Sequence, residues 1–457
     1  MAQAFFGGVH PHDMKAATNE KAIEQLAPSA VVVIPMSMHF GAPCTPLVKA
    51  GDHVKVGQKI GEFHGLGAPI HASVSGTVKA VEPRPYSMGG NITSVVIEND
   101  MQDEVSEEVQ APADPNALSV EEMVEIVKNA GIVGMGGATF PTHVKITSGI
   151  GKVNTVIING AECEPYITGD HRTMLERPEE IIGGAKFLAK MFGVDKVVIG
   201  VEDNKRNGID AMNKVIAEQK APVVVEPLRC RYPQGGEKQL CQAITGRQVP
   251  PGGLPADIGC AVFNINTTCA IYRALTTGMP VVRKIVTVSG SGVVEPKNLE
   301  CPIGTPVSNL LDACGGLKDG TYKLIAGGPM MGMAQYTADI SVAKGTGAIL
   351  AFCENEEKTV ENPQCIRCGK CVSVCPMHLE PLFMYQYASK GMVEELNDAH
   401  IMDCMECGAC SYICPARMHL THMFKTGKQL VKDKAAADRA AAEAKKKAEE
   451  AKEAAAK

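Results

Sequence analysis

A repeated cysteine pattern in the last quarter of the chain constrains the fold more than any other feature. Three cysteines spaced by two residues, then a fourth three residues later and a proline, occur twice: Cys365, Cys368, Cys371 and Cys375 before Pro376, and Cys404, Cys407, Cys410 and Cys414 before Pro415. Three thiolates at this spacing wrap one corner of an iron–sulfur cubane. Zinc sites usually use two separated cysteine pairs or include histidine. The repeat therefore predicts two [4Fe–4S] clusters and electron transfer.

The fourth cysteine of each motif is expected to serve the other cluster, as it does in bacterial two-cluster ferredoxins. We predict one cluster on Cys365, Cys368, Cys371 and Cys414, and the other on Cys404, Cys407, Cys410 and Cys375. The stretch between the motifs has helical periodicity from Pro381 to Leu396, which indicates the helical variety of this domain. The nine other cysteines lack ligand spacing and are expected to be mostly buried small hydrophobic residues.

The whole chain is long enough for several domains, because 457 residues correspond to three or four units of ordinary size. A net charge of −6 without a long basic patch, together with no Trp, 9 Tyr and 11 Phe, argues against a nucleic acid partner. No apolar run approaches the roughly 20 residues that span a bilayer. The N-terminus lacks the pattern of a secretory signal, so we expect a cytoplasmic, soluble or peripheral protein.

Residues 1–99 are expected to hold an N-terminal segment and a small all-β domain. Gly51–Ile60 and Ala68–Val78 resemble the two halves of a biotinyl/lipoyl-type barrel-sandwich hybrid, without the lysine hairpin that carries a swinging arm. His53, His64 and His71 are predicted to be surface residues rather than ligands. Residues 100–118, rich in acidic side chains and proline, are expected to form a solvated linker.

Residues 119–283 alternate between helix and strand signals. Ser119 and Glu122 form the sequence of a capping box for a helix through Lys128. Strands are then expected at 156–158, 197–201 and 223–225, with helices at 178–192 and 209–219. Strands separated by helices of this length predict a parallel, Rossmann-like sheet.

Three further segments complete the predicted organisation. Residues 284–353 return to β-character with a short helix at 307–313, which favours a β-grasp (SLBB-like) domain. The two-cluster domain occupies 354–430, and 431–457 form an Ala/Lys/Glu-rich tail that is either a lone charged helix or disordered. The predicted fold class is thus multidomain α/β plus β, with a barrel-sandwich hybrid, a Rossmann-like domain, a β-grasp domain and a helical ferredoxin domain.

A glycine-rich segment, Gly131-Ile132-Val133-Gly134-Met135-Gly136-Gly137-Ala138-Thr139-Phe140-Pro141, follows the capped helix directly. Glycines let backbone N–H groups approach a phosphate or a ring system closely. The segment lies after a helix and before the first strand, which is the wrong context for a dinucleotide fingerprint. Taken alone, it fits a tight interdomain turn as well as a binding loop.

The segment resembles the flavin loop of the NADH-oxidising flavoprotein subunit of respiratory complex I, whose pattern is Gly-x-Gly-Gly-Ala-Gly-Phe-Pro-Thr-x-x-Lys. Three further stretches match that family in order: Asn159–Pro165, Tyr232–Leu240 and Asn264–Thr267. The resemblance implies that these segments bind FMN and present NAD(H) to it.

The resemblance also implies roles for individual residues. Those expected along FMN, near its phosphate or ring, or around its pocket are Gly134, Gly136, Gly137, Ala138, Lys145, Asn159, Tyr232, Asn264 and Thr267, and those expected to face NADH are Glu164 and Glu237. The chain departs from the pattern at four positions, where Met135, Thr139, Ala161 and Gly236 replace Arg, Gly, Asp and Glu. These departures bear on the affinity and potential of the flavin.

The order of all these modules, with Gly7-Gly8-Val9-His10-Pro11 near the start, resembles the C subunits of Rnf complexes over about residues 5–430. The resemblance implies a ferredoxin:NAD oxidoreductase that moves Na+ or H+, with this chain as the NAD-reactive peripheral subunit on the cytoplasmic side of the cell membrane. It implies the other membrane and peripheral subunits as partners, and ferredoxin indirectly. Two alternatives are a cobalamin reductase of a microcompartment, whose cluster domain precedes its terminal β-grasp region, and a flavin-free electron-transfer adaptor.

Overall fold

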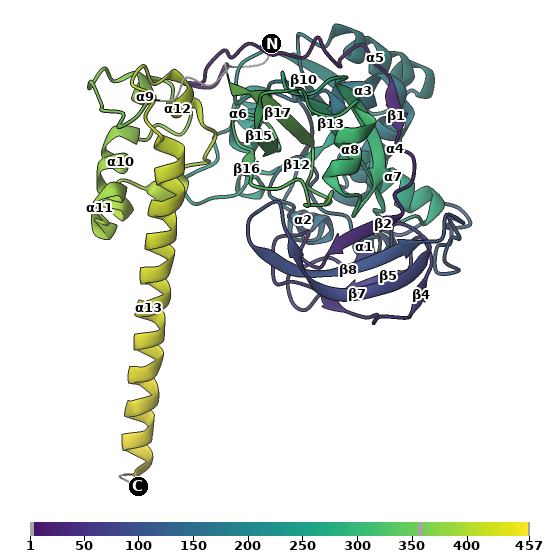
Figure 1. Ribbon diagram of the computed structural model, residues 1–457, viewed down its shortest axis with the longest axis horizontal. Coiled ribbons are helices and arrows are strands. Elements are labelled where there is room, and N and C mark those ends of the chain that lie inside the picture. The colour runs from purple at the N-terminus through teal and green to yellow at the C-terminus, as the bar shows by residue number, and fades with distance from the viewer. Residues whose placement is uncertain (1–3, 355–359, 456–457) are drawn as a thin grey trace. The chain divides into compact units, whose positions relative to one another are not determined.

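The structure is a computed structural model that describes residues 4–354 and 360–455 (Figure 1). The described chain falls into two compact units. One contains residues 11–354, and the other contains residues 5–10 together with residues 360–455.

The first domain of the larger unit is built from two small, largely antiparallel sheets. They are β2 (Val31–Pro35), β8 (Asn91–Asn99), β7 (Gly76–Pro85) and β4 (His53–Val54) in one sheet, and β3 (Thr45–Pro46), β5 (Lys59–Glu62) and β6 (Ile70–His71) in the other. Val32 and Ile34 are fully buried, because alternate residues of β2 face the core. His53 and His64 are exposed as predicted, whereas the prediction for His71 was wrong: its ring is buried, and burial lowers its pKa to about 3.

The acidic segment that follows lies partly along this domain. Val105 forms a parallel bridge with Val56, and the Lys55 ammonium contacts Glu104 at 2.8 Å and Glu107 at 2.6 Å. Most of its side chains are exposed, which agrees with the expected solvated linker.

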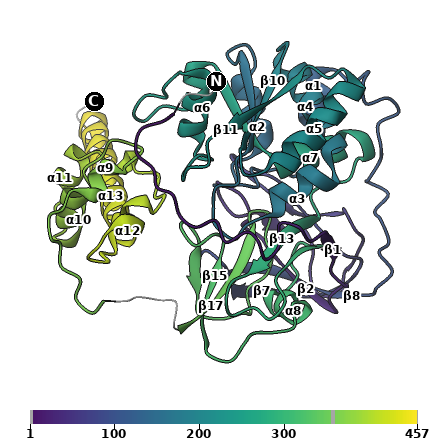
Figure 2. The same ribbon diagram turned by 90° about the horizontal axis from the view of Figure 1, so that it is seen from above.

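The α/β domain contains a four-stranded parallel sheet in the order β11-β10-β9-β12. Figure 2 labels two of these strands, β10 and β11, with helices of the domain around them. Its elements are α1 (Val120–Asn129), α2 (Thr142–Gly149), β9 (Thr155–Gly160), α3 (Gly169–Glu176), α4 (Pro178–Phe192), β10 (Val197–Glu202), α5 (Arg206–Gln219), β11 (Val223–Leu228), α6 (Glu237–Thr245), η1 (Pro255–Ile258), β12 (Cys260–Asn264) and α7 (Ile265–Thr277). The predicted capping box is present: Glu122 N donates to Ser119 Oγ, and Ser119 N donates to Glu122 Oε2. The bounds of α4 coincide with the predicted 178–192, since Pro178 begins the helix and Gly193 ends it in a left-handed conformation.

The two faces of the parallel sheet have separate cores. Val156 and Ile158 of β9 pack in the main core with α4 and α7, while the intervening Ile157 packs with Leu240 and Cys241 of α6. Continuous apolar strands of this kind are typical of parallel sheets covered on both faces. The carboxyl edge of the sheet is left for the loops that follow each strand.

The β-grasp domain has a six-stranded sheet in the order β1-β14-β13-β17-β15-β16. Its elements are β1 (Ile23–Gln25), β13 (Arg283–Ser289), β14 (Lys297–Pro302), α8 (Val307–Ala313), β15 (Thr321–Ala326), β16 (Met333–Gln335) and β17 (Ala348–Cys353). The short helix has the predicted bounds. Sequence reasoning missed that the N-terminal β1 pairs in parallel with β14 and so extends this sheet.

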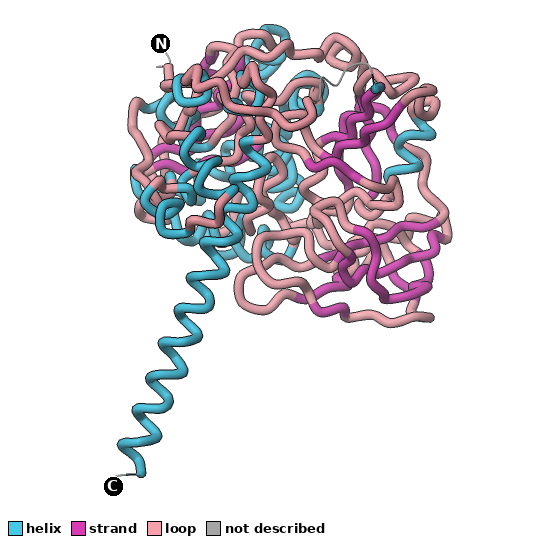
Figure 3. The backbone as a smooth tube through the Cα atoms, turned by 60° about the vertical axis from the view of Figure 1, so that its left-hand side comes forward, coloured by secondary structure: helices cyan, strands magenta, loops and turns pink. Residues whose placement is uncertain are grey.

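The smaller unit is helical, as the periodicity between the cysteine motifs predicts. It consists of α9 (Lys370–Ser373), α10 (Pro381–Ser389), α11 (Val393–Asp398), η3 (Ile401–Asp403), α12 (Ala409–Ile413) and α13 (Leu420–Ala455). Residues 5–10 pack here: Gly8 N donates to Val374 O at 2.8 Å, and the Phe6 ring stacks on His378. The predicted tail is the distal part of α13, which Figure 3 shows as one long helix. Its side chains are exposed from Lys432 to Lys447.

The structure also bears on two broader predictions, which concern the burial of the other cysteines and membrane-spanning segments. Six of the nine cysteines outside the motifs are buried, as predicted: Cys44, Cys241, Cys260, Cys269, Cys301 and Cys314. Within residues 4–354 and 360–455, no helix is both long enough and apolar enough to cross a membrane.

Candidate functional site

The eight motif cysteines line two cavities in the smaller unit. One cavity is lined by Cys365, Cys368, Cys371 and Cys414, and the other by Cys404, Cys407, Cys410 and Cys375. Each set thus combines three thiols of one motif with the fourth of the other. The four thiols of each set lie around the cavity that they line. Four thiols around a space fit a [4Fe–4S] cage.

The two halves repeat their backbone as well as their sequence. Positive φ angles fall at matching positions: Arg367 and Glu406 before the second cysteine, Gly369 and Gly408 after it, and His378 and Arg417 after the proline. Backbone N–H groups donate to sulfur at matching positions too, from Arg367 to Cys365 at 3.3 Å and from Glu406 to Cys404 at 3.4 Å. Hydrogen bonds to the ligating sulfurs are one factor that sets a cluster's potential.

The two cysteine sets differ in exposure. Cys365 and Cys368 are exposed, whereas Cys407 and Cys410 are buried. At the second cavity, Lys428 donates to Cys404 O and pairs with Glu406 at 2.8 Å, which ties α13 to the motif loop. A cluster on the first set is therefore the more accessible of the two.

The predicted flavin residues gather at the carboxyl edge of the parallel sheet. Asn159 lies near the end of β9, and Asn264 ends β12 and caps helix α7. The glycine-rich loop connects α1 to α2 beside them. Ligands of open α/β sheets bind at this edge, so the fold brings together four sequence segments that lie far apart in the chain.

The glycine-rich loop is fastened to the first turn of α7. Met135 N donates to Thr267 Oγ1 at 2.9 Å, and Thr267 Oγ1 donates to Val133 O at 3.3 Å. A Cβ on Gly136 would lie 2.7 Å from Asn264 Nδ2, so this position admits no side chain without displacement. Gly137 and Ala138 are exposed, and a Cβ on Gly137 would meet nothing within 4 Å. The loop therefore presents bare backbone to an open face.

Lys145 and Glu237 form an ion pair. Lys145 Nζ, on α2, lies 2.7 Å from Glu237 Oε1 at the start of α6 and donates to Val262 O at 3.0 Å. Both side chains are partly exposed. The structure thus brings the residue predicted near the phosphate or ring of FMN together with one predicted to face NADH.

A second group joins the end of β9 to the segment before α6. Asn159 Nδ2 donates to Gly235 O at 2.9 Å, and Gly235 N donates to the Cys163 sulfur at 3.3 Å. The Tyr232 hydroxyl donates to Glu164 Oε1 at 3.3 Å. Glu164 also accepts from the backbone N–H groups of Met330 and Met331, both at 3.1 Å, and burial raises its pKa to about 7. Its carboxyl group is therefore directed to the β-grasp domain as well as to Tyr232.

The residues present fit a flavin nucleotide. Gln234 Nε2 is buried without a hydrogen-bond partner, two residues after Tyr232 of the predicted pocket. A buried amide without a partner is costly, and a bound polar ligand would satisfy it. Lys145 adds a positive charge suited to a phosphate, and the exposed loop glycines allow close approach.

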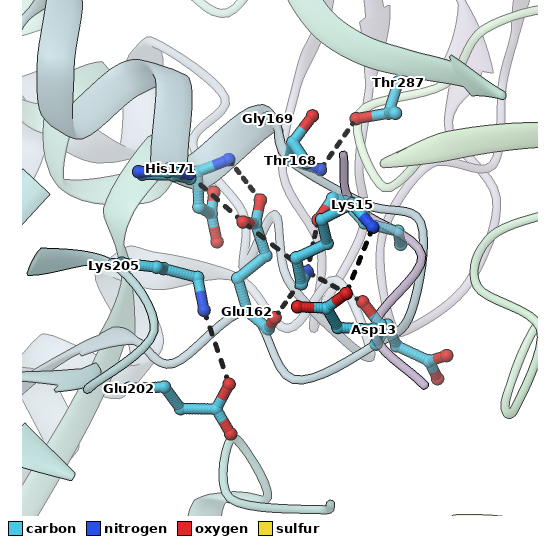
Figure 4. A network of polar contacts seen from close by, with 12 residues as sticks. Asp13, Lys15, Glu162, Thr168, Gly169, His171, Glu202, Lys205 and Thr287 are labelled. Carbon is cyan, nitrogen blue, oxygen red and sulfur yellow. Dashed lines mark hydrogen bonds and ion pairs between the residues drawn. The ribbon is translucent and has the colours of Figure 1, made fainter. Parts of the chain in front are cut away.

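A buried network of charges under this edge was not predicted (Figure 4). Its members are Lys15, Glu162, Glu202 and Lys205, with Asp170 and Lys284 beside them. Burial raises the pKa of Glu162 and lowers that of Lys15, while attraction between the two charges opposes both shifts. Burial also raises the pKa of Asp170 and lowers that of Lys284 to about 8. These lysines belong to no motif, so no sequence signal singles them out.

An open groove elsewhere in the α/β domain involves none of these residues. It is lined by parts of α4, α5 and α7, including Lys190, Gln219 and Tyr272. None of the residues predicted for the flavin site lines it.

Four family models match the chain in the predicted order. They are the RnfC barrel sandwich hybrid domain at 3–102, the Nuo51 FMN-binding domain at 127–273, the SLBB domain at 285–334 and the 4Fe-4S dicluster domain at 357–415. These matches confirm the predicted fold class and the predicted flavin and iron–sulfur modules. The boundaries between the domains and the roles of individual site residues stay predictions.

A solved structure shares the fold at low identity. The chain is 18% identical to a chain in the crystal structure of an NAD+-reducing [NiFe]-hydrogenase in the H2-reduced state, with a TM-score of 0.50, over 69% of this chain and 64% of that one. The match concerns the fold alone.

Curated relatives match nearly the whole chain. The chain is 45% identical to the C subunit of a Na+-translocating ferredoxin:NAD+ oxidoreductase complex of Acetobacterium woodii, over 87% of this chain and 90% of the relative. It is 43% identical to the C subunit of a proton-translocating ferredoxin:NAD+ oxidoreductase complex of Clostridium ljungdahlii, over 88% of each chain. It is 41% identical to the C subunit of an ion-translocating oxidoreductase complex of Rhodobacter capsulatus, over 82% of this chain and 73% of the relative. The chain therefore belongs to the family of C subunits of ion-translocating ferredoxin:NAD+ oxidoreductase complexes, the Rnf complexes.

Proposed function

We propose that this chain is the NAD-reactive subunit of a membrane-associated complex that couples electron transfer between ferredoxin and NAD to the movement of Na+ or H+. One observation carries the proposal: a single chain joins a flavin-type loop at the carboxyl edge of a parallel sheet to two cavities that are each lined by four thiols. The flavin-type loop suits a two-electron carrier, and the two thiol-lined cavities suit two one-electron centres.

Each part of the chain has a distinct task. When bound, FMN supplies the exchange between the electron pair of NADH and the single electrons that clusters carry. Gly134, Gly136, Gly137 and Ala138 offer backbone to the flavin, and Lys145 neutralises its phosphate. Glu237 orients Lys145 through their ion pair.

Other residues shape the pocket. Asn159 and Asn264 position the ends of β9 and β12, and Thr267 fastens the glycine-rich loop. Tyr232 closes the pocket and holds Glu164, which faces the side where NADH enters. The buried Gln234 amide gains a partner when the nucleotide binds.

The cysteine sets hold the two [4Fe–4S] clusters in the crossed arrangement. The crossed fourth ligands, Cys375 and Cys414, force the two halves together and keep the clusters close enough to pass single electrons. The exposed set around Cys365 and Cys368 is where electrons enter or leave the pair.

The partners are the other membrane and peripheral subunits of the complex, which carry the ion path, and ferredoxin reacts with the chain only through them. The chain sits on the cytoplasmic side of the cell membrane as a peripheral subunit. The net charge of −6 gives no basis for nucleic acid binding.

The test is an anaerobic NADH titration of the purified chain, with flavin followed by absorbance, clusters by EPR, and iron and FMN quantified in the same sample. We expect flavin bleaching, cluster reduction and about eight irons per chain, the content of two cubanes. Iron without flavin and without any response to NADH would instead support the flavin-free adaptor. The cobalamin reductase alternative is not retained, because the chain belongs to the Rnf C-subunit family.

A further inference from the structure

The loop that carries Cys163 and Glu164 is folded around a lysine from a distant part of the chain. This β9–α3 loop (residues 161–168) connects the end of β9 to the start of α3. Lys15, near the N-terminus, inserts its ammonium group into it (Figure 4). Lys15 Nζ donates to Glu162 O at 2.9 Å, to Glu164 O at 3.0 Å and to Ile167 O.

These contacts use the full donor capacity of the lysine. An ammonium group has three N–H donors, and here three backbone carbonyls of one loop converge on it. Lys15 is only 4% exposed, so its ammonium group is shielded from solvent and its donors are directed to the loop. A second buried lysine, Lys205, donates to Ala161 O at 2.8 Å, so the first carbonyl of the loop is held in the same way.

The N-terminal segment also runs along the loop through its backbone and hydroxyl groups. Tyr166 N donates to Asp13 O at 2.8 Å, and the Thr18 and Thr168 hydroxyls lie 2.7 Å apart. The motif before it, Gly7–Pro11, has no role in the proposed chemistry. Residues 13–18 thus hold the β9–α3 loop in place, a role of the N-terminal segment that was not predicted from the sequence.

The loop needs such support because its backbone is strained. Glu162 and Tyr166 have positive φ angles of 46° and 68°, which residues other than glycine rarely adopt. Residues in such conformations persist only where their surroundings impose them. Lys15 contacts the carbonyl of Glu162, and Asp13 contacts the amide of Tyr166.

Three carbonyls of the loop contact Lys15, while the side chains of Cys163 and Glu164 contact the segment of the predicted flavin pocket that contains Tyr232. The Cys163 sulfur accepts from Gly235 N, and the Glu164 carboxylate accepts from the Tyr232 hydroxyl. The Glu162 carboxylate caps α3 by accepting from Asp170 N at 2.6 Å. An altered loop backbone would therefore move Cys163 and Glu164 away from their partners in the pocket.

We propose that Lys15 is a positioning residue for the flavin and nicotinamide site, which it orders through the carbonyls of the β9–α3 loop. The proposal rests on the proposed function for the identity of the ligand. Lys15 touches neither nucleotide; it makes the N-terminal segment part of the site's framework.

The experiment compares the full chain with Lys15→Met, which keeps an unbranched side chain one atom shorter and removes all three donors. The matched control is Lys21→Met, because Lys21 lies in the same segment and donates to Pro296 O at an exposed position. FMN affinity is measured on the flavin-free chain by fluorescence, and KM and kcat are measured for NADH with ferricyanide as the acceptor. Hydrogen–deuterium exchange is followed in the flavin-free chain for peptides covering residues 161–168.

We expect Lys15→Met to weaken FMN binding or raise the KM for NADH by about tenfold or more, as the loss of several buried hydrogen bonds implies. Deuterium uptake in the β9–α3 loop should rise while the iron content stays unchanged, and Lys21→Met should match the wild type. If Lys15→Met has the same FMN affinity, KM for NADH and deuterium uptake as the wild type, the proposal is wrong.

A second variant separates positioning from a failure to fold. Lys15→Ala leaves a void the size of three carbons and an ammonium group, and n-propylammonium offers this missing alkyl chain and its N–H donors. We expect added n-propylammonium to restore FMN binding in Lys15→Ala and tetramethylammonium, which has no N–H donor, to have no effect. Equal effects of the two cations would contradict the proposal. If the wild type binds neither FMN nor NADH, the proposed function fails, and the exchange measurement still decides the role of Lys15.

Discussion

Lys145 Nζ lies 2.7 Å from Glu237 Oε1, and this contact joins helix α2 to the first residue of α6. The two residues come from motifs almost a hundred positions apart in the chain, one expected beside the flavin and one beside NADH. Their pairing places the residue predicted for the flavin and the residue predicted for NADH at one location.

Removing the Lys145 charge should weaken flavin binding without affecting the clusters. Because hydrogen bonds to charged groups contribute about 1.5–3 kcal/mol, Lys145→Met should lower FMN affinity by roughly 10- to 100-fold. Lys152→Met, at an exposed position just beyond α2, is the matched control. FMN titration and iron analysis on the same samples measure the effect. Loss of iron along with flavin would contradict the division into separate cofactor sites.

Gly137 tests whether the glycine-rich loop lies against a ligand. A Cβ at this position meets no protein atom within 4 Å, so Gly137→Ala should leave the melting temperature of the flavin-free chain unchanged. It should still weaken FMN binding, because the methyl group occupies the face offered to the flavin. Gly347→Ala is the control, since its Cβ also meets nothing. Unchanged FMN affinity in Gly137→Ala would place the flavin elsewhere.

The crossed cysteine sets predict the outcome of double substitutions. Cys375 and Cys404 line the same cavity, so replacing both with Ala should remove one cluster and leave about four irons. Cys371 and Cys375 line different cavities, so replacing both should damage both clusters. Uncrossed sets would give the reverse pattern, and iron analysis with EPR distinguishes the two.

The exposure of Cys365 and Cys368 predicts unequal stability of the two clusters. Cys407 and Cys410 are buried, so ferricyanide with a chelator should remove iron in two phases. The Cys375→Ala/Cys404→Ala variant retains only the exposed cluster and should show the fast phase alone. A slow phase in that variant would assign the faster loss to the buried set.

The Glu164 carboxyl group should make stability depend on pH. Burial raises its pKa from 4.5 to about 7, so between these values the folded chain binds more protons than the unfolded chain. Its contribution to the free energy of unfolding therefore decreases as pH rises through this range, by as much as ~3 kcal/mol. Glu164→Gln removes this dependence. Urea unfolding of flavin-free wild type and variant from pH 4.5 to 7.5, followed by circular dichroism, measures the difference between them; a constant difference would contradict the raised pKa.

Much of the fold follows from local patterns. Helices α4 and α8 have their predicted bounds because Pro178, Gly193 and the flanking glycines mark helix ends through their own backbone restrictions. Strand β9 is a short apolar run between turn signals, and its type follows from composition alone. The crossed cysteine sets could be predicted because fixed spacing determines which thiols can reach one cage.

The sequence by itself determined the two sets of motif cysteines, because their chemistry depends on spacing over a few positions. The order of the modules and the flavin followed from the resemblance of several segments to known families. Only the tertiary structure decided that His71 is buried, that β1 joins the β-grasp sheet and that Lys15 lies inside the β9–α3 loop. The reason is physical: a lone lysine has the same local pattern whether solvent or three carbonyls surround it. Its partners lie about 150 residues away, and only the packing of the chain brings them together.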